Sequence, residues 1–197
     1  MTRALFIVDV QNDFTEGGAL GVAGGDAVAE GISAHLAAHA SEYALVVASR
    51  DWHDADSDNG GHFALDEKGG GPDFVDTWPV HCVAGTPGAE YDPALATGAV
   101  THHVKKGQGV PAYSLFEGTT DAGEKVGDLL AAHGVTEVDV TGIATDYCVR
   151  ASALDAIAHG VHVRILTALV AGVAPESSQA ALAELAHAGA DLVEGAE

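Results

Sequence analysis

Short apolar runs alternate with amphipathic segments along the chain. Apolar runs that predict strands lie at residues 4–10, 43–49, 99–106, 136–143, 161–169 and 190–195, and the weaker run at 99–106 is expected nearer a sheet edge. Apolar positions three or four residues apart predict helices at residues 26–40, 121–133, 145–160 and 175–188. Strand–helix alternation with apolar strands is typical of a parallel sheet covered on both faces. The pattern therefore predicts one α/β domain over residues 1–197, a three-layer α/β/α fold with a mostly parallel central sheet of about six strands.

Composition narrows the class of protein. The chain has 197 residues and a hydrophobic content of 47%, which suits a globular protein with a substantial core. Its 29 acidic and 8 basic residues give a formal net charge of −21, which would repel nucleic acid and anionic membranes. Asp9 interrupts the N-terminal apolar run, so we expect no signal peptide. These features favour a cytoplasmic protein with a small-molecule partner, and they leave a homo-oligomer open.

Chemically active residues follow the predicted strands. In an open parallel sheet, ligands bind beyond the carboxyl ends of the strands. Five such residues occupy those positions: Asp9, Asp51, His53, Lys106 and Cys148. A base, a cation and a thiol on adjacent strand ends would suit nucleophilic catalysis.

Cys148 and Asp9 also have a structural interpretation. Cys148 begins a predicted helix, where unpaired N–H groups and the helix dipole would favour a thiolate and could hold an oxyanion. A buried structural cysteine fits Cys148 equally well. Asp9 is costly to bury without a partner, but it could instead cap a turn. On this evidence, both interpretations stay open.

The long polar segment after the second predicted strand carries candidate metal ligands. Asp51 and His53 lie on the same side of an extended chain, and His62 and His81 lie downstream on loops that can fold back. Histidine and carboxylate together suit zinc, iron or manganese. Because the chain has 11 histidines, a polar loop with scattered histidines is the alternative.

Six stretches together resemble the nicotinamidase/pyrazinamidase branch of the isochorismatase-like cysteine hydrolases. The similarity is closest to the actinobacterial pyrazinamidases and covers nearly the whole chain. The matching stretches are "VDVQNDF" (8–14), "RDWH" (50–53), "HF" (62–63), "WPVHCVAGTPGAE" (78–90), "KKG" with "AYSLFEG" (105–118) and "VDVTGIATDYCVR" (138–150). Six blocks in the right order are far more specific than any single motif.

The resemblance implies a role for each matching residue. Asp9, Lys106 and Cys148 match the family's catalytic triad, and the alignment favours Lys106 over its neighbour Lys105. The implied ligands of one divalent ion, zinc before iron(II) or manganese(II), are Asp51, His53, His81 and the additional actinobacterial histidine, His62. The loop before His62, "DADSDNGG", is longer than in that family.

The substrate pocket can be assigned in the same way. Phe14, Trp78 and Tyr113 match the aromatic walls of the family's pocket. The bond between Ile143 and Ala144 matches its cis non-proline peptide, which would direct the N–H groups of Ala144 and Cys148 into an oxyanion hole. Tyr147 stands where the mycobacterial members have histidine.

The implied activity is hydrolysis of nicotinamide, and of pyrazinamide, to the acid and ammonia through a cysteine thioester, with a role in NAD salvage. Three alternatives compete. An amidohydrolase for carbamoyl or ureido substrates would generally lack the metal ligands, and an isochorismatase would do without Cys148. A non-enzymatic thiol or metal protein would leave Asp9 and Lys106 unexplained.

Overall fold

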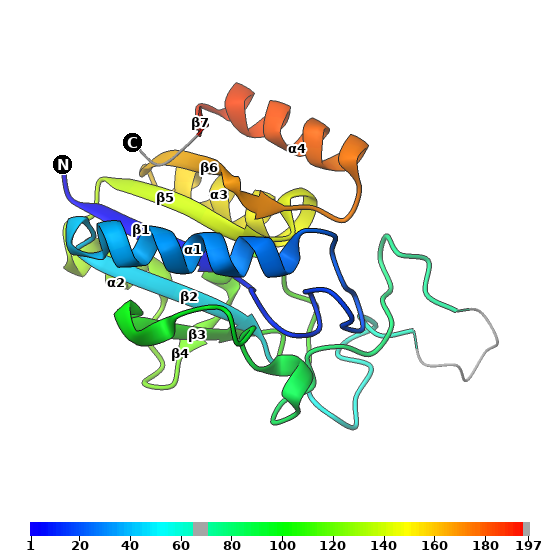
Figure 1. Cartoon of the computed structure of the whole chain (residues 1–197). Coiled ribbons are helices and arrows are strands. Elements are labelled where there is room, and N and C mark those ends of the chain that lie inside the picture. The colour runs from blue at the N-terminus through cyan, green and yellow to red at the C-terminus, as the bar shows by residue number, and fades with distance from the viewer. Residues whose placement is uncertain (65–70, 195–197) are drawn as a thin grey trace.

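The computed structural model describes residues 1–64 and 71–194. Its centre is a sheet of seven strands in the order β4-β3-β2-β1-β5-β6-β7 (Figure 1). The strands are β1 (Arg3–Val8), β2 (Leu45–Asp51), β3 (His102–Lys106), β4 (Thr119–Thr120), β5 (Glu137–Ile143), β6 (His162–Ala171) and β7 (Asp191–Val193). Every neighbouring pair is parallel except β3 and β4. The predicted fold class is confirmed.

The α-helices are α1 (Gly25–His39), α2 (Val126–Ala132), α3 (Arg150–Ala158) and α4 (Pro175–Ala188). A π-turn at Thr145–Val149 leads into α3, and shorter 3-10 turns lie at Ala40–Glu42, Pro87–Ala89, Thr97–Ala99 and Leu115–Glu117. No helix among the described residues is long and apolar enough to cross a membrane.

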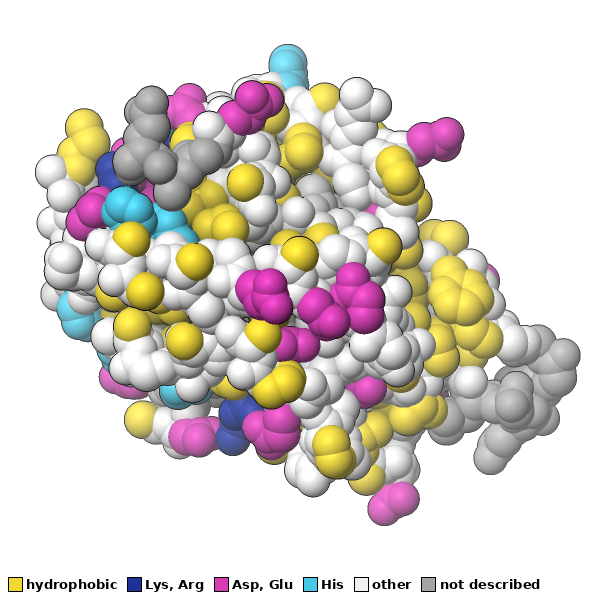
Figure 2. All heavy atoms as spheres, in the orientation of Figure 1, with side chains coloured by type: hydrophobic (Ala, Val, Ile, Leu, Met, Phe, Trp, Pro, Cys, Tyr) yellow, Lys and Arg dark blue, Asp and Glu magenta, His cyan; other side chains and the backbone are white. Residues whose placement is uncertain are grey.

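The alternation of β1 produces the three layers. Leu5 and Ile7 belong to the core cluster beneath α1, whereas Phe6 and Val8 belong to the cluster that α2, α3 and α4 cover. Successive strand residues point to opposite faces, so an uninterrupted apolar strand needs helices on both sides. In Figure 1, α1 lies over one face of the sheet, with α2 and α3 over the other. Acidic side chains are spread over the face of the molecule drawn in Figure 2, as the net charge predicted.

The structure differs from the prediction in two respects. The sheet has one strand more than expected, because β4 has two residues and is too short to show a period. That strand pairs with β3, which therefore lies second from the edge. The helix expected from residue 121 begins only at Val126, after a turn at Gly123 whose φ is 81°. Gly195, the last residue of the final predicted strand, lies outside the described residues.

The topology determines where a site can form. The chain proceeds from β1 outward to β4, and then returns to the other side of β1 to build β5, β6 and β7. The carboxyl end of β1 is thus the point at which the order of strands reverses. In open α/β sheets such a switch point leaves a crevice for ligands. Asp9 immediately follows β1 there, with a left-handed φ of 49°.

Candidate active site

Lys106 is the centre of a buried ionic cluster. Its ammonium lies 2.9 Å from Asp9 Oδ2, also donates a hydrogen bond to Asp51 Oδ1, and lies 3.7 Å from Cys148 Sγ. The pairing of Asp51 with Lys106 across β2 and β3 explains one contact, because directly opposed residues bring their side chains together. Lys106 and Asp9 are fully buried. The structure therefore brings the three residues of the expected triad into one cluster.

Lys105 points the other way. Its ammonium donates to Asp121 Oδ1 at 2.8 Å and lies 4.8 Å from the centre of the Trp52 ring. Adjacent strand residues face opposite sides, so only one lysine of the pair can reach the ionic cluster. That residue is Lys106, as the alignment favoured.

Burial controls the protonation of this cluster. It raises the pKa of the Asp9 carboxyl, against the attraction of Lys106. It would also raise the pKa of Asp51, but the charge of Lys106 and the two neighbouring histidines hold that pKa well below its ordinary value. Burial alone would lower the pKa of Lys106, whereas Asp51 and Asp9 raise it well above its ordinary value. The resting cluster therefore contains a permanent cation beside Asp9.

The thiol behaves differently from the sequence-based expectation. Burial raises the pKa of Cys148 well above its ordinary value, with Lys106 acting in the opposite direction. The prediction of an acidic thiol was wrong, because it considered the helix N-terminus and left out desolvation. The resting sulfur is a thiol, so a nucleophilic attack by this sulfur would require its proton to leave. Asp9 and Cys148 both contact the Lys106 ammonium, so the carboxyl and the thiol lie in the same buried cluster.

Two further buried residues support these side chains. Ser49 on β2 donates to Asp9 Oδ1 at 2.7 Å, which leaves Oδ2 facing Lys106. The Gln11 side chain pairs with both backbone groups of Asp51: it accepts from the N–H at 2.8 Å and donates to the carbonyl at 2.9 Å. Sequence reasoning missed both residues. A polar residue within or just after an apolar strand, as in "VDVQNDF", was the available signal.

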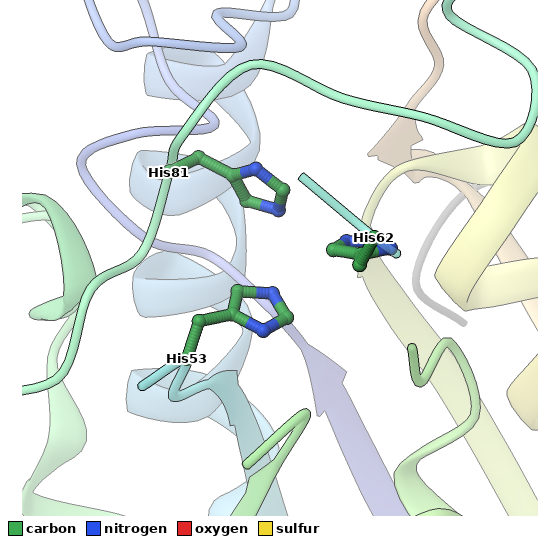
Figure 3. A group of neighbouring side chains, drawn as sticks. All are labelled: His53, His62 and His81. Atoms are coloured by element: carbon green, nitrogen blue, oxygen red, sulfur yellow. The ribbon is translucent and has the colours of Figure 1, made fainter. Parts of the chain in front are cut away.

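Three histidines form a second cluster beside the first. Nitrogen atoms of His53, His62 and His81 all lie within 4.8 Å of one another, and all three side chains are buried. Figure 3 shows the three rings pointing toward one another. Asp51 Oδ2 lies 3.5 Å from His53 Nε2 and 3.7 Å from His81 Nε2. The longer loop before His62 therefore still brings this residue to the other candidate ligands.

The hydrogen bonds of these rings fit a metal centre. His53 Nδ1 lies 2.8 Å from the carbonyl of Gly107, and His81 Nδ1 lies 2.8 Å from that of Pro79. A carbonyl partner makes Nδ1 the protonated nitrogen and leaves the lone pair of Nε2 free for a metal. His53 Nε2 and both nitrogens of His62 are buried with no hydrogen-bond partner among the described residues. Burial lowers the pKa of His62 to about 4, which keeps it neutral as a ligand must be.

A pocket of about 300 Å³ opens between the two clusters. Its lining includes Phe14, Trp78, Tyr113, Asp51, His62, His81, Ala144 and Cys148. The expected aromatic walls and the expected nucleophile, Cys148, thus face one cavity. Trp78 Nε1 donates to the Tyr113 hydroxyl at 3.1 Å. The lining also contains Leu20, Val22, Phe74, Tyr147 and Val173, to which sequence reasoning assigned no role in the pocket.

The chain turns sharply just before the segment that carries Cys148. The peptide bond between Ile143 and Ala144 is cis, as the resemblance predicted. The carbonyl of Ala144 accepts the N–H groups of Tyr147 at 3.0 Å and Val149 at 3.1 Å. These bonds wind the segment into the π-turn and bring Ala144 and Cys148 to the same wall of the pocket.

Known proteins share this architecture. A family model described as the isochorismatase domain matches residues 3–197. The nicotinamidase/pyrazinamidase of Mycobacterium tuberculosis is 49% identical over 191 residues, which cover 97% of this chain and 98% of that protein. The pyrazinamidase of Pyrococcus horikoshii in complex with zinc superposes with a TM-score of 0.81 at 39% identity, covering 99% of this chain and 100% of that chain. PnC1 from L. infantum in complex with nicotinate gives a TM-score of 0.81 at 36% identity, covering 98% and 92%. The chain therefore belongs to the isochorismatase family, as its resemblance to the nicotinamidase and pyrazinamidase members predicted.

Proposed function

We propose that the protein hydrolyses nicotinamide, and pyrazinamide, to the aromatic acid and ammonia. The observation that carries this proposal is the buried cluster of Asp9, Lys106 and Cys148 at one end of a pocket that also meets the three-histidine cluster. The relatives' names and the nicotinate and zinc in their crystal structures support it. The protein would act in the cytoplasm and supply nicotinate for NAD salvage.

The first half-reaction makes a thioester. Cys148 Sγ attacks the carboxamide carbon while its proton passes to Asp9. Lys106 balances the negative charge of the cluster throughout, and the N–H groups of Ala144 and Cys148 hold the oxyanion. The carbon–nitrogen bond then breaks, and Asp9 returns the proton to the leaving group to give ammonia.

The second half-reaction repeats the same proton movements. Water attacks the thioester carbon and gives a proton to Asp9. The carbon–sulfur bond breaks, and the proton returns to the sulfur as nicotinate leaves. One carboxylate therefore serves both steps, because it alternates between base and acid.

The histidine cluster would fix the ring of the substrate. Three imidazoles and the Asp51 carboxylate suit zinc, which is the ion we propose, with iron(II) and manganese(II) as alternatives. An ion held by these residues would supply a Lewis acid for the ring nitrogen of the substrate. Phe14, Trp78 and Tyr113 would hold the faces and edges of the ring. The same histidine cluster argues against the carbamoyl or ureido alternative, which has no ring nitrogen to bind.

An ammonia-release assay tests this function. The wild type should release ammonia from nicotinamide, and Cys148→Ala should lose this activity while keeping its fold and metal content. Cys82→Ala is the matched control, because Cys82 is a buried thiol outside the lining of the pocket and should be dispensable. Ammonia release by Cys148→Ala within about tenfold of wild type would contradict the nucleophile assignment.

A further inference from the structure

An exposed phenylalanine forms part of the wall of the pocket. Phe74 is 54% exposed, yet it lines the same cavity as Cys148 and His62. Its ring meets the Trp78 ring edge-on, with centroids 6.3 Å apart and planes at 85°. Because the other aromatic walls are buried or half-buried, Phe74 stands at the mouth of the cavity, where the far edge of a bound ring would lie.

The turn that carries Phe74 is held by its own hydrogen bonds. Asp73 Oδ1 accepts the N–H groups of Val75, Asp76 and Thr77, each at 2.9 Å. The N–H of Asp73 donates to Thr77 Oγ1 at 3.0 Å, and that of Phe74 donates to the carbonyl of Thr77 at 3.1 Å. The three N–H groups that donate to Asp73 Oδ1 stabilise the charged carboxylate and strongly lower its pKa. The carboxylate therefore organises a closed turn over residues 73–77.

This turn holds Phe74 in an unfavourable backbone conformation. Its φ is 58°, in the left-handed region that bulky residues avoid. Such a conformation costs on the order of 1–3 kcal/mol and persists only where the surrounding structure enforces it. The Tyr147 hydroxyl also donates to the carbonyl of Phe74 at 3.4 Å, which joins the turn to the residue beside the nucleophile. The conformation places an apolar ring at the mouth of the pocket.

We propose that Phe74 is a specificity-determining residue and that Asp73 is its positioning residue. Phe74 completes the wall around a single-ring heteroaromatic amide and obstructs amides with a second fused ring. This inference rests on the proposed function and deepens it by naming the substrate class. Phe74 would contact the part of the ring remote from the reacting carbon, so its contribution is equal in the substrate complex and the transition state. Such uniform binding changes KM and leaves kcat nearly unaltered.

Steady-state kinetics of the metal-loaded full chain test the proposal. Phe74→Ala should raise KM for nicotinamide by about 5- to 50-fold with kcat within about twofold. The same variant should gain relative activity on quinoline-3-carboxamide, which keeps the ring nitrogen and the amide but adds a fused ring. Val75→Ala is the matched control, because Val75 is 66% exposed on the same turn and does not line the pocket.

Asp73 should act only through Phe74. Asp73→Ala should reproduce the rise in KM, and Asp73→Asn, which keeps an acceptor oxygen, should restore part of the loss. In the Phe74→Ala background, Asp73→Ala should add nothing, since residues that act through one contact are not additive. The dissociation constant of nicotinate, measured by quenching of tryptophan fluorescence, should follow the same order among the variants.

The outcomes distinguish the proposed function from the inference. A wild type that releases no ammonia from nicotinamide would overturn the proposed function and this inference with it. An active wild type, with Phe74→Ala unchanged in KM, nicotinate binding and quinoline-3-carboxamide activity, would overturn the inference alone. Additive effects of the two substitutions would remove the positioning role of Asp73.

Discussion

Replacing Lys106 by methionine tests the ionic cluster directly. Methionine keeps most of the volume of the side chain and removes the charge. Lys106 is fully buried and contacts two buried carboxylates, Asp9 and Asp51. Removing one partner of a buried ion pair costs about 3–5 kcal/mol, because the remaining charge loses its compensation.

That cost translates into a measurable change in melting temperature. In a domain of this size, each kcal/mol of destabilisation lowers Tm by roughly 2–4 °C. Lys106→Met should therefore lower Tm by about 6–20 °C. Its kcat should fall by at least about 100-fold, because charge stabilisation at the reacting sulfur is lost.

Lys105→Met is the matched control. Lys105 contacts Asp121, whose side chain is 81% exposed, and the Trp52 ring, so the same chemical change there removes a surface ion pair and one cation–π contact. Its Tm should stay within about 2 °C of wild type and its activity within about twofold. Thermal unfolding by circular dichroism and ammonia release measure both quantities on the two variants. Equal losses in both would refute the assignment of Lys106 as the buried charge partner.

Three further changes probe the base, the metal ligands and their support. Asp9→Asn should lower kcat by about 10²–10⁴-fold. In the wild type, kcat/KM should fall as the pH drops through the raised pKa of Asp9, because the protonated carboxyl cannot accept a proton. A pH profile whose activity does not fall on the acid side above pH ~4 would contradict this. His53→Ala should reduce the preference for nicotinamide over benzamide by about 100-fold, since benzamide has no ring nitrogen. If the ratio of kcat/KM for nicotinamide to kcat/KM for benzamide is unchanged in this variant, the ion does not bind the ring nitrogen. Gln11→Ala should reduce metal content and Tm, because it leaves the buried backbone N–H and carbonyl of Asp51 without their partner. The neighbouring Asn12→Ala loses one exposed contact to Pro87 and should retain both properties. Similar metal content in the two variants would exclude a supporting role of Gln11 at Asp51.

The hydrophobic pattern of the sequence predicted most of the strands and helices, but it did not by itself identify the site residues. The strands and α4 lie where apolar periodicity placed them, because burial on both faces leaves a strong signal in a parallel strand. The two-residue β4 and the turn before α2 left no such signal. The candidate site residues came from positions after strand ends and from matching motifs, and the structure brings them together around one cavity.

What the sequence alone determined is local: the order of strands and helices, and which polar residues follow each strand. The tertiary structure decided what depends on distance and desolvation. It enclosed Lys106 and left Lys105 outside, since that choice depends on strand register with β2. It brought His62 to His53 and His81 across a long loop, and it buried Cys148 deeply enough to raise the pKa of the thiol. Contacts between residues remote in sequence, and the exclusion of water around them, leave no periodic trace in the chain, so the hydrophobic pattern alone does not predict them.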